Sequence, residues 1–136
     1  MINIARNIAY GCFLIMGLSA CSSNGWHSSE LPIRSAKTSV GISYVDNLNR
    51  PLYIFLRDEY GKSSCYKSCA EAWPPLLAGE YAIASGNFTL IKRNDGKMQW
   101  AIDDLPLYRF VDDDGSGEAN GHRLAYRVAA TMKHGS

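Results

Sequence analysis

Cys65 and Cys69 of this 136-residue chain have the type and spacing of residues that could form a disulfide or a redox couple. Residues four apart on a helix lie about 6 Å apart at Cα, a separation that a disulfide can bridge. Catalytic thiol pairs usually have two intervening residues and a low-pKa thiol at a helix start. The three intervening residues here favour a structural disulfide, with a redox couple as the alternative.

A tyrosine and an aspartate separated by four residues form a second pattern, which occurs twice. Tyr53 precedes Asp58, and Tyr108 precedes Asp113. The two carboxylates could act as an acid/base pair. Their duplication is explained more simply by one structural role in each copy, in which the aspartate accepts backbone N–H bonds in the turn after its strand. No catalytic residue is assigned, since the sequence has no nucleophile-elbow, His-Glu-x-x-His or phosphate-loop motif.

An acidic loop, residues 112–120, places oxygen-bearing side chains at alternate positions, as the first half of a calcium loop does. The candidate calcium ligands are Asp112, Asp114, Ser116 and Glu118. Twelve residues along, however, stands Arg123 and not the bidentate Glu of an EF-hand, so a solvated acidic turn is favoured over a Ca²⁺ site. No other cofactor is indicated, because the three histidines share no metal-ligand spacing.

The segments that carry these residues are related by an internal repeat. Residues 51–58 match residues 106–113 at a constant offset of 55, and an alternating strand with a turn precedes each copy, at 40–49 and at 98–104. The repeat unit is therefore predicted to be a β-hairpin. Since a strand alternates its faces, the following aromatic residues are expected to share one face in each copy and to pack together: Tyr53, Phe55, Tyr108 and Phe110.

Other elements are predicted between and after the repeats. Ser64–Ala72 is expected to form a short helix capped by Ser64 and ended by Trp73-Pro74-Pro75. Asn94-Asp95-Gly96 predicts a hairpin turn, and 124–129 a last strand. The predicted fold is mainly β: a duplicated β-hairpin repeat packed as a small sheet or sandwich, with one short helix near Cys65–Ala72.

The amino terminus has the order of a secretory signal, with Arg6 in a basic start, an apolar run at 8–18, and small residues before Cys21. Leu18-Ser19-Ala20-Cys21 resembles the bacterial lipobox, which implies that Cys21 is the lipidated first residue of the mature chain. The alternative is an ordinary secretory signal in which Cys21 is an incidental cysteine near the cleavage site. The domain assignment follows: signal peptide 1–20, lipidated end and flexible tether 21–37, duplicated β domain 38–130, and tail 131–136. Cys12 leaves with the signal, so Cys65 and Cys69 remain to pair.

The composition fits one globular domain, with 46% hydrophobic and 20% charged residues. The formal net charge is only +1, far from the positive field that phosphate-backbone binding requires. A nucleic-acid partner is therefore not expected.

The two Tyr-x4-Asp copies, Leu18-Ser19-Ala20-Cys21 and Cys65-x3-Cys69-Ala70-x2-Trp73-Pro74-Pro75-Leu76 together resemble the bacterial secreted-repeat lipoproteins of unknown function. The resemblance covers about Tyr44 to Gly121. This chain departs from the family pattern at Lys67, where a Gly is expected, and at Tyr126, where a Trp is expected. The resemblance implies an envelope lipoprotein with a duplicated β domain, and it brings no activity.

These observations predict a lipid-anchored envelope protein that is a non-catalytic binding or structural module, in the outer membrane if the host has two membranes. Its expected partners are the membrane, through the anchor, and an envelope protein or the cell wall. A binding surface is expected around exposed Tyr66, Trp73 and Tyr81 with the acidic loop. The alternative is a redox- or metal-linked envelope protein that uses Cys65 and Cys69 or loop 112–120.

Overall fold

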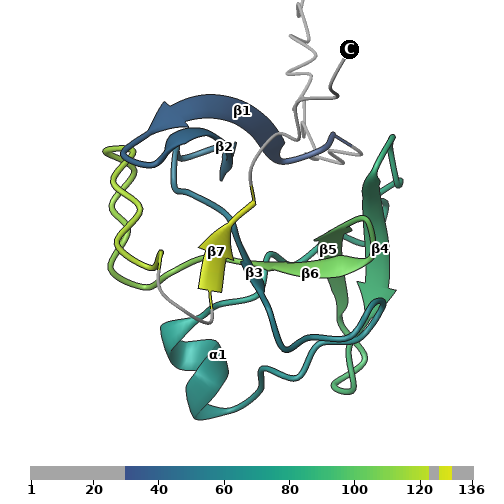
Figure 1. Ribbon diagram of the computed structural model, residues 1–136. Helices are drawn as coiled ribbons and strands as arrows, with labels where there is room; N and C mark the ends of the chain where they lie inside the picture. Colours follow the sequence, from purple (N-terminus) through teal and green to yellow (C-terminus); the bar gives the residue numbers. More distant parts are fainter. Residues whose placement is uncertain (1–29, 123–125, 130–136) are drawn as a thin grey trace, which may run out of the picture.

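The computed structural model describes residues 30–122 and 126–129, in which the chain forms two antiparallel β-sheets and one short helix (Figure 1). The elements are β1 (Ile33–Thr38), β2 (Gly41–Asp46), β3 (Tyr53–Phe55), α1 (Ser68–Ala72), β4 (Phe88–Lys92), β5 (Met98–Ile102), β6 (Leu105–Tyr108) and β7 (Tyr126–Val128). One sheet is β1-β2, and the other has the order β4-β5-β6-β3-β7. The prediction of a mainly β fold with one short helix is confirmed.

The two repeats meet at the pairing of β3 with β6. The strands are antiparallel, and their register places Tyr53 opposite Tyr108 and Ile54 opposite Leu107. The equivalent residues Tyr53 and Tyr108 therefore face each other, as a residue and its copy do across the two-fold axis of a symmetric dimer. The two repeats therefore pair through the tyrosine of each motif, and strands of both repeats form one sheet.

Alternate residues of the central strands enter two different parts of the core. Tyr53 and Tyr108 pack with Cys65 and Trp73 on one side of the sheet. Leu52 and Leu107 belong to the second cluster, and that cluster also holds the following side chains: Ile33, Leu76, Phe88, Trp100, Ile102 and Ala129. The predicted sharing of one face by the repeat aromatics is confirmed, because the strand period of two separates them from the aliphatic residues.

The predicted second hairpin is formed by β5 and β6. Its turn residues Asp103 and Asp104 both have positive φ, 48° and 64°, as a two-residue hairpin turn of the right twist requires. The predicted Asn94-Asp95-Gly96 turn joins β4 to β5, with Gly96 at φ 82°. Both turns therefore lie where the sequence places them.

The first repeat differs from the predicted hairpin. β2 pairs along its whole length with β1, from Ile33 opposite Asp46 to Thr38 opposite Gly41. Toward the first copy of the motif β2 makes only the bridge between Val45 and Pro51. The boundary expected at residue 38 therefore differs from the structure, because residues 33–37 of the expected tether form most of β1 and are held by its ladder of hydrogen bonds.

Several predicted features lie outside the described residues: the signal peptide 1–20, Cys21, the first part of the tether and the tail 131–136. Within the described ranges, no helix has the length and apolar character needed to cross a bilayer.

Helix α1 begins later than predicted and without the predicted cap. It starts at Ser68, its N-cap residue is Lys67, and no side chain caps it. Ser64 instead donates its backbone N–H and its hydroxyl to the Asp58 carboxylate, at 2.9 and 2.5 Å. The helix ends at Ala72, before Trp73 and the two prolines, as predicted.

Replacing Lys67 by glycine is expected to stabilise the domain by about 1 kcal/mol. Lys67 has φ 53° and ψ −127°, a conformation that a Cβ atom disfavours and glycine adopts freely. Denaturant unfolding of Lys67→Gly beside Lys67→Ala would measure the effect, because alanine retains the Cβ atom. Equal stabilisation by alanine would show that the side chain, and not the backbone, carries the strain.

Candidate functional site

The two Tyr-x4-Asp motifs are joined crosswise. The Tyr53 hydroxyl donates to Asp113 Oδ2 at 2.6 Å, and the Tyr108 hydroxyl donates to Asp58 Oδ2 at 2.5 Å. Each tyrosine therefore binds the aspartate of the other repeat. Both tyrosine side chains are completely buried, so these bonds satisfy hydroxyl groups that would otherwise be costly to remove from water.

The second oxygen of each carboxylate organises the loop that follows its own motif. Asp58 Oδ1 accepts the N–H and hydroxyl of Ser64. Asp113 Oδ1 accepts the backbone N–H and side-chain N–H of Asn120, at 3.0 and 3.1 Å. Each aspartate thus ties its own loop to the partner repeat's tyrosine, and both oxygens of each carboxylate are engaged in structural bonds.

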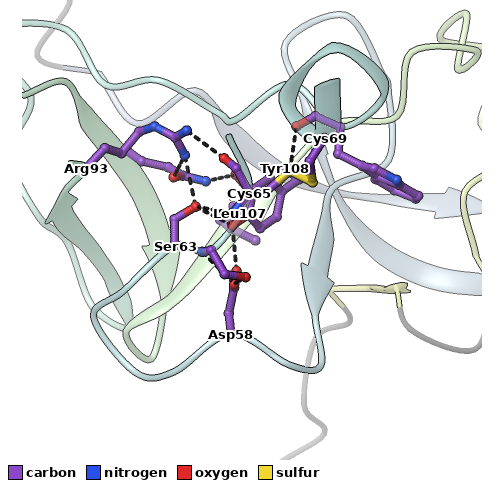
Figure 2. Close-up of a disulfide and its surroundings, with 10 residues drawn as sticks. Asp58, Ser63, Cys65, Cys69, Arg93, Leu107 and Tyr108 are labelled. Carbon is purple, nitrogen blue, oxygen red and sulfur yellow. Dashed lines mark hydrogen bonds between the residues drawn. A yellow bond between two sulfur atoms is a disulfide. The ribbon is translucent and has the colours of Figure 1, made fainter. Parts of the chain in front are cut away.

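Behind Tyr108 lies a buried arginine, Arg93, whose side chain is 2% exposed. Its guanidinium donates to Ser63 Oγ at 3.0 Å, to Gln99 Oε1 at 2.7 Å and to the Cys65 carbonyl at 2.8 Å. Asp95 forms an ion pair with this guanidinium, with Asp95 Oδ2 3.4 Å from Arg93 Nε. Figure 2 shows these bonds continuing from Arg93 through Ser63 toward Tyr108 and Asp58.

The donors in this network can be assigned by elimination. Arg93 can only donate to Ser63 Oγ, and the Tyr108 hydroxyl donates its proton to Asp58 Oδ2. The 2.7 Å bond between Ser63 and Tyr108 is therefore donated by Ser63. The result is a directed chain of bonds from a buried cation to a carboxylate, in which every member is satisfied.

The second tyrosine has a different environment. Tyr53 accepts the backbone N–H of Gly121 at 3.2 Å and packs edge-on against Trp73, with ring centroids 5.3 Å apart. A Cβ atom at Gly121 would collide with Trp73 and Phe110. Position 121 must therefore be glycine for the backbone to approach the Tyr53 hydroxyl.

Both tyrosine hydroxyls are held in their neutral form. Burial, and next the hydrogen bond to Asp113, raises the pKa of Tyr53 above its usual value of 10.0. Burial, and next the hydrogen bond to Asp58, raises the pKa of Tyr108 in the same direction. The motif therefore presents two neutral donors bound to two occupied carboxylates, an arrangement suited to holding the repeats together.

The predicted disulfide between Cys65 and Cys69 is present, with Cα atoms 5.3 Å apart. Cys65 is fully buried. Its backbone N–H donates to Ser63 Oγ at 3.3 Å, and its carbonyl accepts from Arg93. The disulfide therefore staples α1 to the polar network around Tyr108.

The acidic loop packs back onto the first unit (Figure 1). Ser39 N–H donates to the Gly117 carbonyl, and the Asn49 side chain donates to the Gly115 carbonyl, both at 2.9 Å. Gly115 has φ 91°, and a Cβ atom there would collide with the Leu48 carbonyl. Loop 112–120 therefore connects the two repeats through hydrogen bonds and close backbone packing.

The candidate calcium ligands do not converge. Asp112, Asp114, Ser116 and Glu118 are all exposed. Asp114 accepts the Ser116 N–H at 2.9 Å, and this turn, with the Ser116 hydroxyl as the first cause, lowers the pKa of Asp114. No group of three or more His, Cys, Asp or Glu side chains in the described part of the chain is arranged to hold a metal ion.

The prediction of an exposed aromatic surface around Tyr66, Trp73 and Tyr81 is wrong for Trp73. Trp73 is buried in the core between Tyr53 and Phe110, and its ring centroid is 4.6 Å from that of Phe110. Tyr66 is partly buried under the Arg93 guanidinium, 4.3 Å away, and Tyr81 alone is largely exposed. Trp73 follows the helix immediately, and the buried Cys65 draws it inward.

A polar pocket of about 260 Å³ opens beside the Tyr108 network. It lies between the loop after β3 and the turn that joins β4 to β5, and its lining is Arg57, Glu59, Lys62, Ser63, Ser64, Tyr66 and Asn94. Ser63 belongs to both the network and the pocket. This pocket is the candidate binding site.

Three residues of the network, Ser63, Arg93 and Gln99, belong to no motif recognised in the sequence. A usable signal existed, since Arg93 and Gln99 lie on the two sides of the predicted Asn94-Asp95-Gly96 turn, where a cation and an amide oxygen can hydrogen-bond across a hairpin. Gln99 lies opposite Ile91 in the β4–β5 ladder, and its Oε1 accepts a hydrogen bond from Arg93, two residues beyond Ile91. Ser63 carries no such signal, because its place depends on the crossing of the repeats.

The fold and the crossed bonds define a β-rich domain made by duplication of one Tyr-x4-Asp unit. The model of the family described as "Secreted repeat of unknown function" matches residues 35–77 and 89–123, one copy around each motif. The chain belongs to this family of secreted repeats. No curated protein and no solved structure matches it.

Proposed function

We propose that this protein is a lipid-anchored envelope protein whose folded domain is a non-catalytic binding module. The observation that carries the proposal is that two different sets of polar residues join the repeats and line the pocket. Crossed hydrogen bonds between the repeats engage the four motif residues, Tyr53, Asp58, Tyr108 and Asp113. The neighbouring pocket presents other polar side chains to solvent, on a segment that the disulfide constrains.

The anchor is proposed from the sequence, and the family's secreted character supports export of the domain. Small residues precede Cys21 at the end of an apolar run, and two or three acyl chains are sufficient for stable membrane attachment. Ser22, in place of Asp, follows the cysteine and favours the outer membrane in a host with two membranes.

Replacing Cys21 by alanine is expected to abolish palmitate labelling and to leave an uncleaved or soluble precursor, since the thiol is the proposed acylation site. Palmitate labelling and membrane fractionation measure this. Cys12→Ala is the matched control, because Cys12 lies within the predicted signal and should leave labelling unchanged. Unaltered labelling of Cys21→Ala would contradict the anchor.

The binding role is tested by a photo-crosslinking residue placed at Asn94 in the pocket and, as a control, at Lys37 on β1. A binding module should give an envelope adduct at position 94 that is absent at position 37. Identical adducts at both positions, or none in native envelopes, would contradict a ligand at this pocket.

A further inference from the structure

The pocket is held in shape before any ligand arrives. Arg93 fixes its floor through Ser63 and through the Cys65 carbonyl. Tyr66 forms a wall, with its ring against Arg93 and its hydroxyl accepting the Asn94 N–H at 2.9 Å. The disulfide closes the same segment. A preorganised wall reduces the ordering cost of binding.

The size and lining of the pocket restrict its ligand. At about 260 Å³ it lies below the range of roughly 300–1,000 Å³ typical for drug-sized ligands. Charged and hydroxyl side chains dominate its lining. It is suited to one small polar group, free or at the end of a larger molecule.

The lining of the pocket holds two cations, Arg57 and Lys62, and one acid, Glu59. Within the part of the chain that the structure describes, no hydrogen bond or ion pair engages the exposed Arg57 side chain. Among the same described residues, the Lys62 ammonium pairs only with Glu59, whose Oε2 lies 3.8 Å from Lys62 Nζ. Both side chains are exposed, so this pair contributes little. The nearby Asp58 carboxylate is already occupied by Tyr108 and Ser64.

We propose that this pocket binds the oxyanion of a small polar ligand, with Arg57 and Lys62 as its ionic contacts. Arginine presents a planar fork of donors that fits a carboxylate or phosphate, and lysine adds a mobile point charge. The inference rests on the proposed binding function and names the ligand chemistry of the same pocket.

Three hexoses that differ mainly in one group test the proposal: glucuronate, glucose 6-phosphate and glucose. Each is titrated into the full-length chain, and amide chemical shifts of residues 57–66 and 94 are followed by NMR. The expected result is saturable shifts with an anionic sugar and none with glucose. Binding should weaken at high salt, because exposed charges are screened.

Variants separate the ionic contacts from the fold. Arg57→Gln with Lys62→Gln should weaken binding by about tenfold or more, since charge-assisted hydrogen bonds are lost. Lys37→Gln should have no effect. Glu59→Gln should tighten binding by severalfold because it removes a negative charge from the pocket lining, a gain that misfolding cannot produce.

The titrations with the three sugars either identify the anionic group of the ligand or contradict the proposal. Binding of glucuronate alone identifies a carboxylate ligand, and binding of glucose 6-phosphate alone identifies a phosphate ligand. Equal binding of glucose, or no shifts with any of the three, would overturn the oxyanion assignment. Crosslinking at position 94 that persists in that case would retain the proposed binding function.

Discussion

Replacing Tyr53 or Tyr108 by alanine is expected to destabilise the domain by about 3–5 kcal/mol, the range for removing a buried aromatic side chain. Both side chains are completely buried, and they face each other across β3 and β6. Each substitution would open a cavity and leave a buried carboxylate oxygen without its donor. Denaturant unfolding measures the loss.

Tyrosine-to-phenylalanine variants isolate the hydroxyl groups. Tyr53→Phe and Tyr108→Phe should each cost about 1.5–3 kcal/mol, as expected for a hydrogen bond to a charged group. Double-mutant cycles should show coupling of Tyr53 with Asp113 and of Tyr108 with Asp58. Stronger coupling within each repeat, Tyr53 with Asp58, would contradict the crossed arrangement.

The same variants should change the alkaline limit of stability. Because the folded-state pKa of both tyrosines is raised above 10.0, their contribution is complete below pH 10 and decreases as the pH rises above it. Each tyrosine then adds a slope of about 1.4 kcal/mol per pH unit. Each phenylalanine variant should lose its share of the slope, while Tyr60→Phe, on the surface, should retain it.

Replacing Arg93 by alanine is expected to cost about 3–5 kcal/mol, the range for breaking a buried charged network by removing one partner. Gln99 Oε1 and the Cys65 carbonyl would lose their Arg93 donor. The Ser63 hydroxyl would lose the cation that orients it toward Tyr108. Thermal and denaturant unfolding measure the loss.

Arg93→Lys is the informative companion, because lysine retains the charge without the planar fork. It should recover only part of the lost stability. Arg34→Ala, at an exposed arginine with one hydrogen bond to Asn49, should cost under about 1 kcal/mol. Comparable losses at positions 93 and 34 would show that the buried network does not contribute as proposed.

The repeat and its turns were predictable because their signals are local. The offset of 55 residues identified the copies, the alternation of strand residues placed Tyr53 and Tyr108 on one buried face, and Asn94-Asp95-Gly96 marked its hairpin. The helix start was predicted too early, since Ser64 is taken by Asp58. Strand β1 was missed because residues 33–37 lack the alternation of period two that marks a strand.

The sequence by itself determined the duplication, the β class and the cysteine pair, since each depends on residues close together or on a direct repeat. Only the tertiary structure decided which aspartate each tyrosine binds. That choice follows from the antiparallel register of β3 and β6, which brings residues 50 to 60 positions apart into contact. The burial of Arg93 was likewise decided by the tertiary structure, because the groups that its guanidinium binds on Ser63 and Cys65 lie 30 and 28 residues away in the chain.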